Sequence, residues 1–303
     1  MVRRAKKKGR EAIRSLQALE KFQRDQDARL RQYRVSRKPN VSIAIREMLE
    51  LRSSSDLNSV NLISRIQVGI CISEKLRSNF QAHGVEEAYF VTLISGMHGV
   101  RASDRNGHVV AAQKAWIASI LEGFSYVGMI EPAYYPAVSF VPPGNQDWIS
   151  WHAHIIVWDT SAAALKALKE IVNGSEDSFR PGGKVFHYRK APPSGIEAEV
   201  AYMCKSPRSE HYTYPVKRMI LDPTTRKRTS TPTGTFKQNK RQLRTGKLVI
   251  VLSALEDKSI EDLCVSGGAG CEIAADALLK AKRGLEEEQR ARDAVIFAAE
   301  KSE

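Results

Sequence analysis

Residues 150–159, SWHAHIIVWD, place two histidines one residue apart at the front of an apolar run. The run is rich in β-branched and aromatic side chains, which predicts a strand. Because successive side chains of a strand point to opposite faces, His152 and His154 share one face with Ile156 and Trp158. The residues between them are apolar and predict a face that packs on the core. The two histidines therefore predict a site on the other face.

Strand and helix patterns alternate on both sides of this stretch, from about residue 86 to residue 206. The order is β-α-β-β-α-β-α, and its first six elements follow the split βαβ arrangement. We therefore predict an α+β domain with a four- to five-stranded antiparallel sheet, helices on one face and the other face open for binding. The predicted strands are 88–95, 125–131, 149–158 and 184–191, and the predicted helices are 109–124, 161–172 and 195–206.

Positive charge is concentrated in two blocks of the chain. The 303 residues carry a formal net charge of +13. Residues 1–40 hold 14 Lys and Arg against four acids, and residues 217–247 hold ten against one, so the remainder is net negative. Two separate dense basic blocks favour nucleic acid as the partner over a solvated charged surface.

Several classes of protein are disfavoured by simple absences. No apolar stretch is long enough to span a bilayer, and the first residues lack a secretory signal, so we expect no membrane partner and a cytoplasmic protein, or a nuclear one if the source is a eukaryotic virus. The four cysteines include no C-x-x-C pair, which argues against a zinc ribbon or a disulfide framework.

Composition divides the chain into four expected regions. The α+β domain is flanked by helical extensions, and a weak helix-turn-helix pattern falls within 41–80. Residues 11–32 have the spacing of a basic amphipathic helix that we expect to be an arm, and 247–255 resemble a strand. The four regions are a basic helical N-terminal region at 1–80, the domain at 81–215, a basic linker-like segment at 216–255 and a helical C-terminal region at 256–303.

A carboxylate is expected beside the two histidines. The strand before theirs ends at Glu131, and the Pro- and Gly-rich residues 132–149 predict a long connection between them. If the two strands are antiparallel neighbours, Glu131 lies near His152 and His154. Two imidazoles and a carboxylate form a divalent-metal site, and with a phosphate substrate this ligand set favours Mn²⁺ or Mg²⁺. The alternative is that both histidines are surface or hydrogen-bonded core residues.

A candidate nucleophile follows on the predicted helix 195–206. Tyr202 and Lys205 are three residues apart and so share a face of this helix. A tyrosine can attack phosphorus covalently, and a nearby cation can stabilise the charge that develops. Tyr-x-x-Lys alone is commonplace, so its meaning depends on the histidines. The fallback nucleophiles are Tyr188, Tyr212 and Tyr214, and His187 could also approach the site, although a structural role is expected for it.

These three elements, in this order, resemble the HUH endonucleases, specifically the replication initiator (Rep) proteins of rolling-circle plasmids, phages and small single-stranded DNA viruses. The resemblance covers about residues 86–210. Residues 90–94, FVTLI, are similar to the first family motif, except that Ile94 or Ser95 stands where a second Thr is usual.

The second and third family motifs carry the chemistry. His152-Ala153-His154 resembles the metal motif, and residues 202–205, YMCK, resemble the motif that carries the nucleophile. The family's additional carboxylate ligand would fall to Glu131. The resemblance implies a single-tyrosine DNA endonuclease and strand transferase, with the metal on Glu131, His152 and His154, Tyr202 as the attacking group and Lys205 as the stabilising cation.

The resemblance also implies a partner and a product. The substrate would be single-stranded DNA or melted origin DNA, and the products a 5′-phosphotyrosyl protein and a free 3′-hydroxyl that primes rolling-circle replication and permits rejoining. No G-x-x-x-x-G-K-[ST] motif is present, so unwinding would need a host helicase.

Two alternatives stay open beside the initiator. A single-tyrosine HUH transposase would use the same residues, whereas the tyrosine of a conjugative relaxase generally precedes the histidines. A non-catalytic nucleic-acid-binding module on a sheet of the RNA-recognition type would use aromatic side chains. The aromatic residues near the histidines, which either stack on bases or pack the hairpin, are Trp148, Trp151, Tyr134 and Tyr135.

Overall fold

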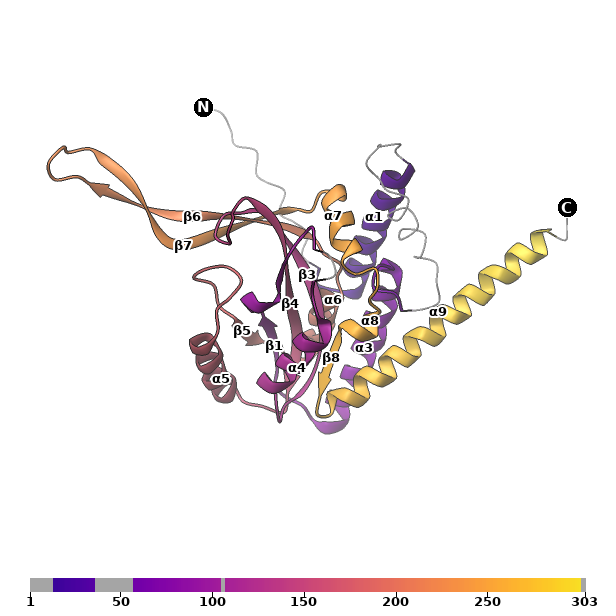
Figure 1. Ribbon diagram of the computed structural model, residues 1–303. Coiled ribbons are helices and arrows are strands. Elements are labelled where there is room, and N and C mark those ends of the chain that lie inside the picture. The colour runs from indigo at the N-terminus through magenta and orange to yellow at the C-terminus, as the bar shows by residue number, and fades with distance from the viewer. Residues whose placement is uncertain (1–12, 36–56, 105–106, 301–303) are drawn as a thin grey trace, which may run out of the picture.

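The computed structural model describes residues 13–35, 57–104 and 107–300. The basic residues 3–10 lie outside this part of the chain, as do residues 41–56 of the helix-turn-helix pattern. Within the described residues the protein is an α+β fold with one sheet between layers of helices (Figure 1). None of the helices in these ranges is both long and apolar enough to cross a membrane.

Four strands form the predicted split βαβ sheet. They are β1 (Ala88–Leu93), β3 (Ser125–Val138), β4 (Gln146–Trp158) and β5 (Phe186–Lys190). Their order is β5-β1-β4-β3, and each neighbouring pair is antiparallel. The α+β class and the pairing of the histidine strand with the strand before it are therefore confirmed.

The sheet is larger than the predicted four to five strands. Among the described residues it has eight strands, because segments distant in sequence join the two edges of the β3–β4 hairpin. The strand β2 (Gly99–Arg101) pairs with β4, and β8 (Cys264–Gly267) pairs antiparallel with β3. A parallel bridge between Tyr134 and Glu210 joins β6 (Ser209–Leu221), which pairs in turn with β7 (Arg228–Gln242). The sheet is therefore mixed rather than wholly antiparallel. Pairing between segments so far apart leaves no local pattern in the sequence.

Helices cover both faces of the sheet, so the expectation of helices on one face is wrong. On the histidine face, Phe80 of α3 (Leu62–His83) packs edge-on against Trp158 with ring centroids 5.5 Å apart. On the opposite face, His108, just before α4 (Val110–Ile120), stacks on Trp151 at 4.4 Å. The histidine face needs this cover because its far end, at Trp158, is apolar. The histidine face also carries α6 (Ile196–Met203), and the opposite face carries α5 (Ala162–Ser175).

The first described helix, α1 (Leu16–Val35), belongs to the core and is not a free arm. Leu19 and Leu30 are fully buried. Gln23 donates to the Cys204 carbonyl at 3.4 Å and accepts from the Ser206 hydroxyl at 2.6 Å, so α1 is bonded to the segment that follows α6. The buried leucines decide the position of α1, although its basic composition had suggested an exposed arm.

The region expected to be a linker is mostly regular. β6 and β7 form a long hairpin that extends away from the sheet (Figure 1), and its turn is closed by the Asp222 side chain, which accepts from the Thr224 and Thr225 amides at 2.8 and 3.1 Å. The expected strand at 247–255 is instead the helix α7 (Thr245–Ser253). A short apolar run does not distinguish strand from helix, which is why this prediction failed.

The C-terminal region is mostly helical. It contains α8 (Ile260–Leu263), the strand β8 and the long α9 (Gly270–Glu300), which runs away from the sheet in Figure 1. Ion pairs with α3 hold the first half of α9, with Lys280 2.7 Å from Glu74 and Lys75 2.6 Å from Asp276. All four cysteines are free. Short 3₁₀ turns lie at Gly96–His98 and Pro193–Gly195.

Candidate metal centre and nucleophile

The register of the β3–β4 hairpin places Glu131 directly opposite His152. Both strands extend well into the predicted connection at 132–149, so that residues 139–145 alone lie between them. Glu131 Oε1 is 2.9 Å from Nε2 of His152 and 3.2 Å from Nε2 of His154. The expected meeting of these three side chains is therefore confirmed.

The three side chains fit a divalent metal. One ligand atom from each lies within 4.8 Å of the others, and all three residues are buried. Thr92 Oγ1 lies 3.1 Å from Nδ1 of His154, a contact that orients the ring and leaves Nε2 toward Glu131. Glu131 Oε2 is buried without a hydrogen-bond partner among the described residues, so the carboxylate retains a free donor atom for a cation. Buried polar atoms are rarely left unsatisfied, and a ligand would explain this one.

Lys205 forms a buried ion pair with the same carboxylate. Its Nζ is 2.5 Å from Glu131 Oε1, and both side chains are less than a tenth exposed. Burial alone would raise the pKa of Glu131, but the charge of Lys205 and the neighbouring His154 hold that pKa well below its usual value. Burial and the charge of Lys205 lower the pKa of His154 to about 3. Glu131 is therefore ionised and His154 neutral, the forms that bind metal.

A second buried cation lies near this cluster. Arg65 of α3 is almost fully buried, and its Nε donates to the Ser59 carbonyl at 3.3 Å. Both of its terminal nitrogens lack a hydrogen-bond partner in the part of the chain that the structure covers. The charge of Glu131 partly offsets the desolvation that lowers the pKa of Arg65. Arg65 therefore adds positive potential behind the carboxylate.

Tyr202 lies on α6 beside the histidines. Its ring centroid is 5.0 Å from that of His154 and 5.8 Å from that of Phe90. Lys205 Nζ is 4.0 Å from the centroid of the Tyr202 ring, although Lys205 follows the end of α6 at Met203. Burial and the charge of Glu131 raise the pKa of Tyr202, so the free phenol is protonated at neutral pH.

These groups line one cleft of about 560 Å³. The cleft also contains residues that sequence reasoning did not select. Arg189 lies beside Phe90, its guanidinium carbon 4.8 Å from the ring centroid, and forms a bidentate ion pair with Glu199. His187, expected to be structural, is exposed and lines the cleft. The sequence analysis had named His187 as able to approach the site, and its alternation with Arg189 on the strand FHYRK was a signal that could also have identified Arg189. The remaining unselected lining residues include Arg208, His211, Gln238 and Lys240.

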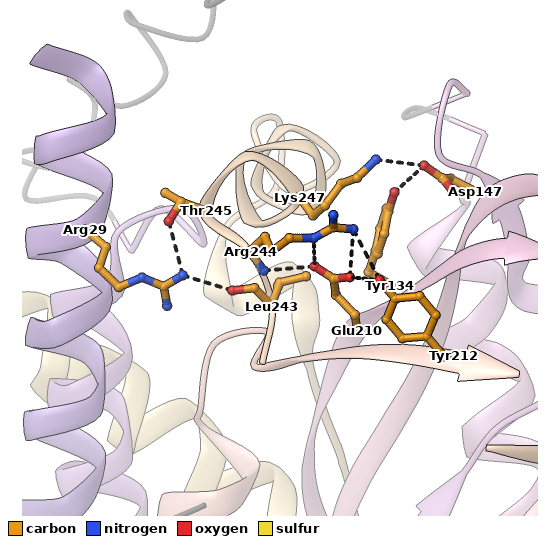
Figure 2. Close-up of polar contacts among 9 residues, drawn as sticks. All are labelled: Arg29, Tyr134, Asp147, Glu210, Tyr212, Leu243, Arg244, Thr245 and Lys247. Atoms are coloured by element: carbon orange, nitrogen blue, oxygen red, sulfur yellow. Dashed lines mark hydrogen bonds and ion pairs between the residues drawn. The ribbon is translucent and has the colours of Figure 1, made fainter. Parts of the chain in front are cut away.

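Three of these residues come from β6 and β7: His211 lies near the end of the predicted domain, whereas Gln238 and Lys240 lie in the segment expected to be linker, where no sequence signal placed them. His211 Nδ1 lies 2.6 Å from Gln238 Nε2, across the two strands. Figure 2 shows how the base of this hairpin is held: Glu210 accepts from the Arg244 side chain at 2.7 and 3.0 Å, and Arg29 of α1 donates to the Leu243 carbonyl at 2.9 Å. The hairpin base is therefore a fixed part of the site.

The fallback tyrosines do not meet the metal ligands. Tyr188 donates to the Ala162 carbonyl at 3.1 Å, on the face opposite His187. Tyr212 donates to Glu210 at 2.8 Å, and Tyr214 is exposed; neither lines the cleft. Tyr202 is thus the tyrosine that lies beside the histidine pair.

The aromatic residues considered for base stacking mostly pack the hairpin. Trp151 and Tyr134 are fully buried, and the Tyr134 hydroxyl bonds Asp147. Tyr135 is buried against Phe179 at 4.8 Å. The hairpin-packing alternative therefore holds for Trp151 and Tyr134, whereas Tyr135 also lines the cleft. Trp148 is only partly exposed, against Phe179.

Comparison with known proteins does not assign this chain to a family. No family model, no curated protein and no solved structure matches it. The chemistry of the cleft is therefore the basis for a function.

Proposed function

We propose that this protein is a single-tyrosine HUH endonuclease that initiates rolling-circle replication by nicking single-stranded or melted origin DNA. One observation carries the proposal: residues drawn from three separate motifs line the same cleft. The ligand atoms of Glu131, His152 and His154 lie within 4.8 Å of one another, and the Tyr202 ring is 5.0 Å from that of His154. Lys205 contacts both the carboxylate and the tyrosine.

The ligand set defines what a metal would contribute. Mn²⁺ or Mg²⁺, when bound by Glu131, His152 and His154, would polarise the scissile phosphate. Thr92 keeps His154 in the orientation that presents Nε2. Glu131, ionised because Lys205 and His154 lower its pKa, supplies the negative charge that an imidazole pair lacks.

Tyr202 would carry out the covalent step. Its phenolic oxygen forms a bond to the 5′ phosphorus, its proton passes to water, and the P–O3′ bond breaks as the 3′ oxygen takes up a proton. Because the pKa of Tyr202 is raised, the phenolate needs a cation, and Lys205 lies 4.0 Å from the ring centroid. The phosphotyrosyl ester conserves bond energy, so attack by a 3′-hydroxyl reverses the reaction and rejoins the strands.

The walls of the cleft suit a DNA backbone. Arg189 of β5, Arg208 of the connection before β6 and Lys240 of β7 line it. Cations of this kind contact phosphates without reading sequence.

Formation of a covalent adduct tests the proposal. The full chain is incubated with Mn²⁺ and single-stranded fragments of its own replicon, and a denaturant-resistant protein–DNA adduct is mapped by mass spectrometry. We expect the adduct on Tyr202, lost in Tyr202→Phe and in His152→Ala/His154→Ala, and kept in the control Tyr214→Phe, which alters an exposed tyrosine outside the cleft. Absence of any adduct across the replicon, despite tight salt-sensitive binding, would instead favour the non-catalytic binding module.

A further inference from the structure

We call the outer part of the β6–β7 hairpin, residues 216–235, the ribbon. Every side chain from Lys217 to Thr235 is exposed except Asp222, which closes the turn. An isolated two-stranded hairpin is only marginally stable in water. We therefore expect a binding partner to stabilise the exposed ribbon.

The charge of the ribbon is of one sign. It carries five cations within twelve residues, and its single acid, Asp222, is engaged by the Thr224 and Thr225 amides. The ribbon therefore presents an uncompensated positive surface, which is complementary to a polyanion. The five cations are Lys217, Arg218, Arg226, Lys227 and Arg228.

Three consecutive aliphatic side chains near the tip are also exposed. Met219, Ile220 and Leu221 have exposed fractions of 59%, 46% and 58%. Alternation directs Met219 and Leu221 to one face of the ribbon and Ile220 to the other. Their cross-strand partners are polar: Met219 lies opposite Ser230, Ile220 opposite Thr229 and Leu221 opposite Arg228. Apolar groups embedded in a cationic surface fit a ligand that has both phosphates and an apolar interior.

The ribbon is anchored at its base and free at its tip. Phe236 packs on Phe140 with ring centroids 5.1 Å apart, and Arg180 donates to the Phe236 carbonyl. Beyond this anchor, residues 216–221 reach roughly 20 Å at about 3.4 Å per residue. Figure 1 shows this part standing clear of the rest of the molecule. A reach of that length exceeds the depth of a DNA groove, about 8 Å.

We infer that the ribbon binds duplex DNA in the minor groove, with its cations on the flanking phosphates and its aliphatic side chains wedged against a base step. Minor-groove proteins commonly insert Met, Ile or Leu between base pairs and kink the duplex. Duplex binding by the ribbon goes beyond the proposed nicking of single strands and does not require it. Because the hairpin base lines the cleft, a duplex on the ribbon would lie next to a single strand that enters the site.

Salt-dependent binding of the full chain to a 30-bp duplex, in EDTA, tests the phosphate contacts. Each lost contact lowers the slope of log affinity against log salt by about 0.9, so Arg218→Gln/Arg228→Gln should lower it by about 1.8. The control Lys282→Gln/Arg283→Gln removes the same charge from α9 and should retain the wild-type slope. A wild-type slope in the ribbon variant would overturn the inference.

Bending of the duplex tests the wedge. Met219→Thr/Ile220→Thr/Leu221→Thr keeps the strand propensity and all charges. At saturating protein, energy transfer between end labels should show bent DNA with the wild type and with the control Ile171→Thr, an exposed aliphatic on α5, and straight DNA with the triple variant. The same bend in the triple variant would exclude a wedge.

Competitors identify the groove and the class of nucleic acid. Distamycin, which occupies the minor groove, should displace the protein from A·T-rich duplex. Equal affinity for an A-form RNA duplex of the same length would overturn the minor-groove assignment. Failure of the nicking proposal would appear only as a missing Mn²⁺-dependent adduct, so the two proposals fail separately.

Discussion

Removal of Lys205 should show how strongly the candidate site depends on its buried ion pair. Lys205 Nζ and Glu131 Oε1 are 2.5 Å apart, and both side chains are less than a tenth exposed. At an effective dielectric constant of about 20, two unit charges at this distance attract by about 7 kcal/mol. Protonation of Glu131 in the Lys205→Met variant would limit the loss. We therefore expect a coupling of about 3 kcal/mol, at the lower end of what breaking a buried pair costs.

A double-mutant cycle measures that coupling. The free energy of unfolding in urea is determined in EDTA at pH 7 for the wild type, Glu131→Gln, Lys205→Met and the double variant. The Glu131→Gln variant should be the less stable single variant, because it also leaves Arg65 without its nearby negative charge.

An exposed ion pair of nearly the same length is the matched control. Lys75 and Asp276 are 2.6 Å apart, but their side chains are 39% and 48% exposed. Their coupling should be below about 1 kcal/mol because water screens them. A coupling as small as this between Lys205 and Glu131 would refute the burial of the pair and, with it, the electrostatic account of the site.

Three further outcomes are expected. At 100 times its dissociation constant, Mn²⁺ should raise the free energy of unfolding of the wild type by about 2.7 kcal/mol, and it should not stabilise His152→Ala/His154→Ala; an equal gain in the variant would place the metal elsewhere. Burial, with the charge of His98, lowers the pKa of His108 to about 3. The unfolded state therefore binds one more proton than the folded state below pH 6.5, and the free energy of unfolding should fall by about 2 kcal/mol between pH 6.5 and 5. His108→Phe should make urea unfolding less pH-dependent in this window, and an unchanged dependence would contradict that pKa. A Cβ at Gly128 would lie 2.7 Å from the His154 carbonyl oxygen, so Gly128→Ala should lower the free energy of unfolding by about 2 kcal/mol in thermal unfolding. The control Gly284→Ala, in open space on α9, should be neutral or stabilising. Equal effects of the two substitutions would contradict the close approach of β3 to β4.

Local sequence patterns indicated most elements of the domain and the three candidate metal ligands. The alternation in residues 150–159 placed His152 and His154 on one face, because side-chain direction along a strand depends only on position. Short-range order also made Glu131 an expected neighbour, since a hairpin returns the chain beside itself. The spacing of Tyr202 and Lys205 indicated one common direction for both. These inferences use contacts close in the chain or the geometry of a single element.

Only the tertiary structure decided what surrounds those ligands. The hairpin β6–β7, which supplies His211 and Lys240 to the cleft, joins the sheet through the bridge between Tyr134 and Glu210. Nothing near residue 210 in the sequence specifies that partner, because pairing between distant segments depends on which sheet edge is left open. Likewise α1, basic in composition, lies in the core because Leu16 and Leu19 pack at Gly69 of α3. Local propensity acts within a few residues, whereas the cleft is assembled from segments more than a hundred residues apart.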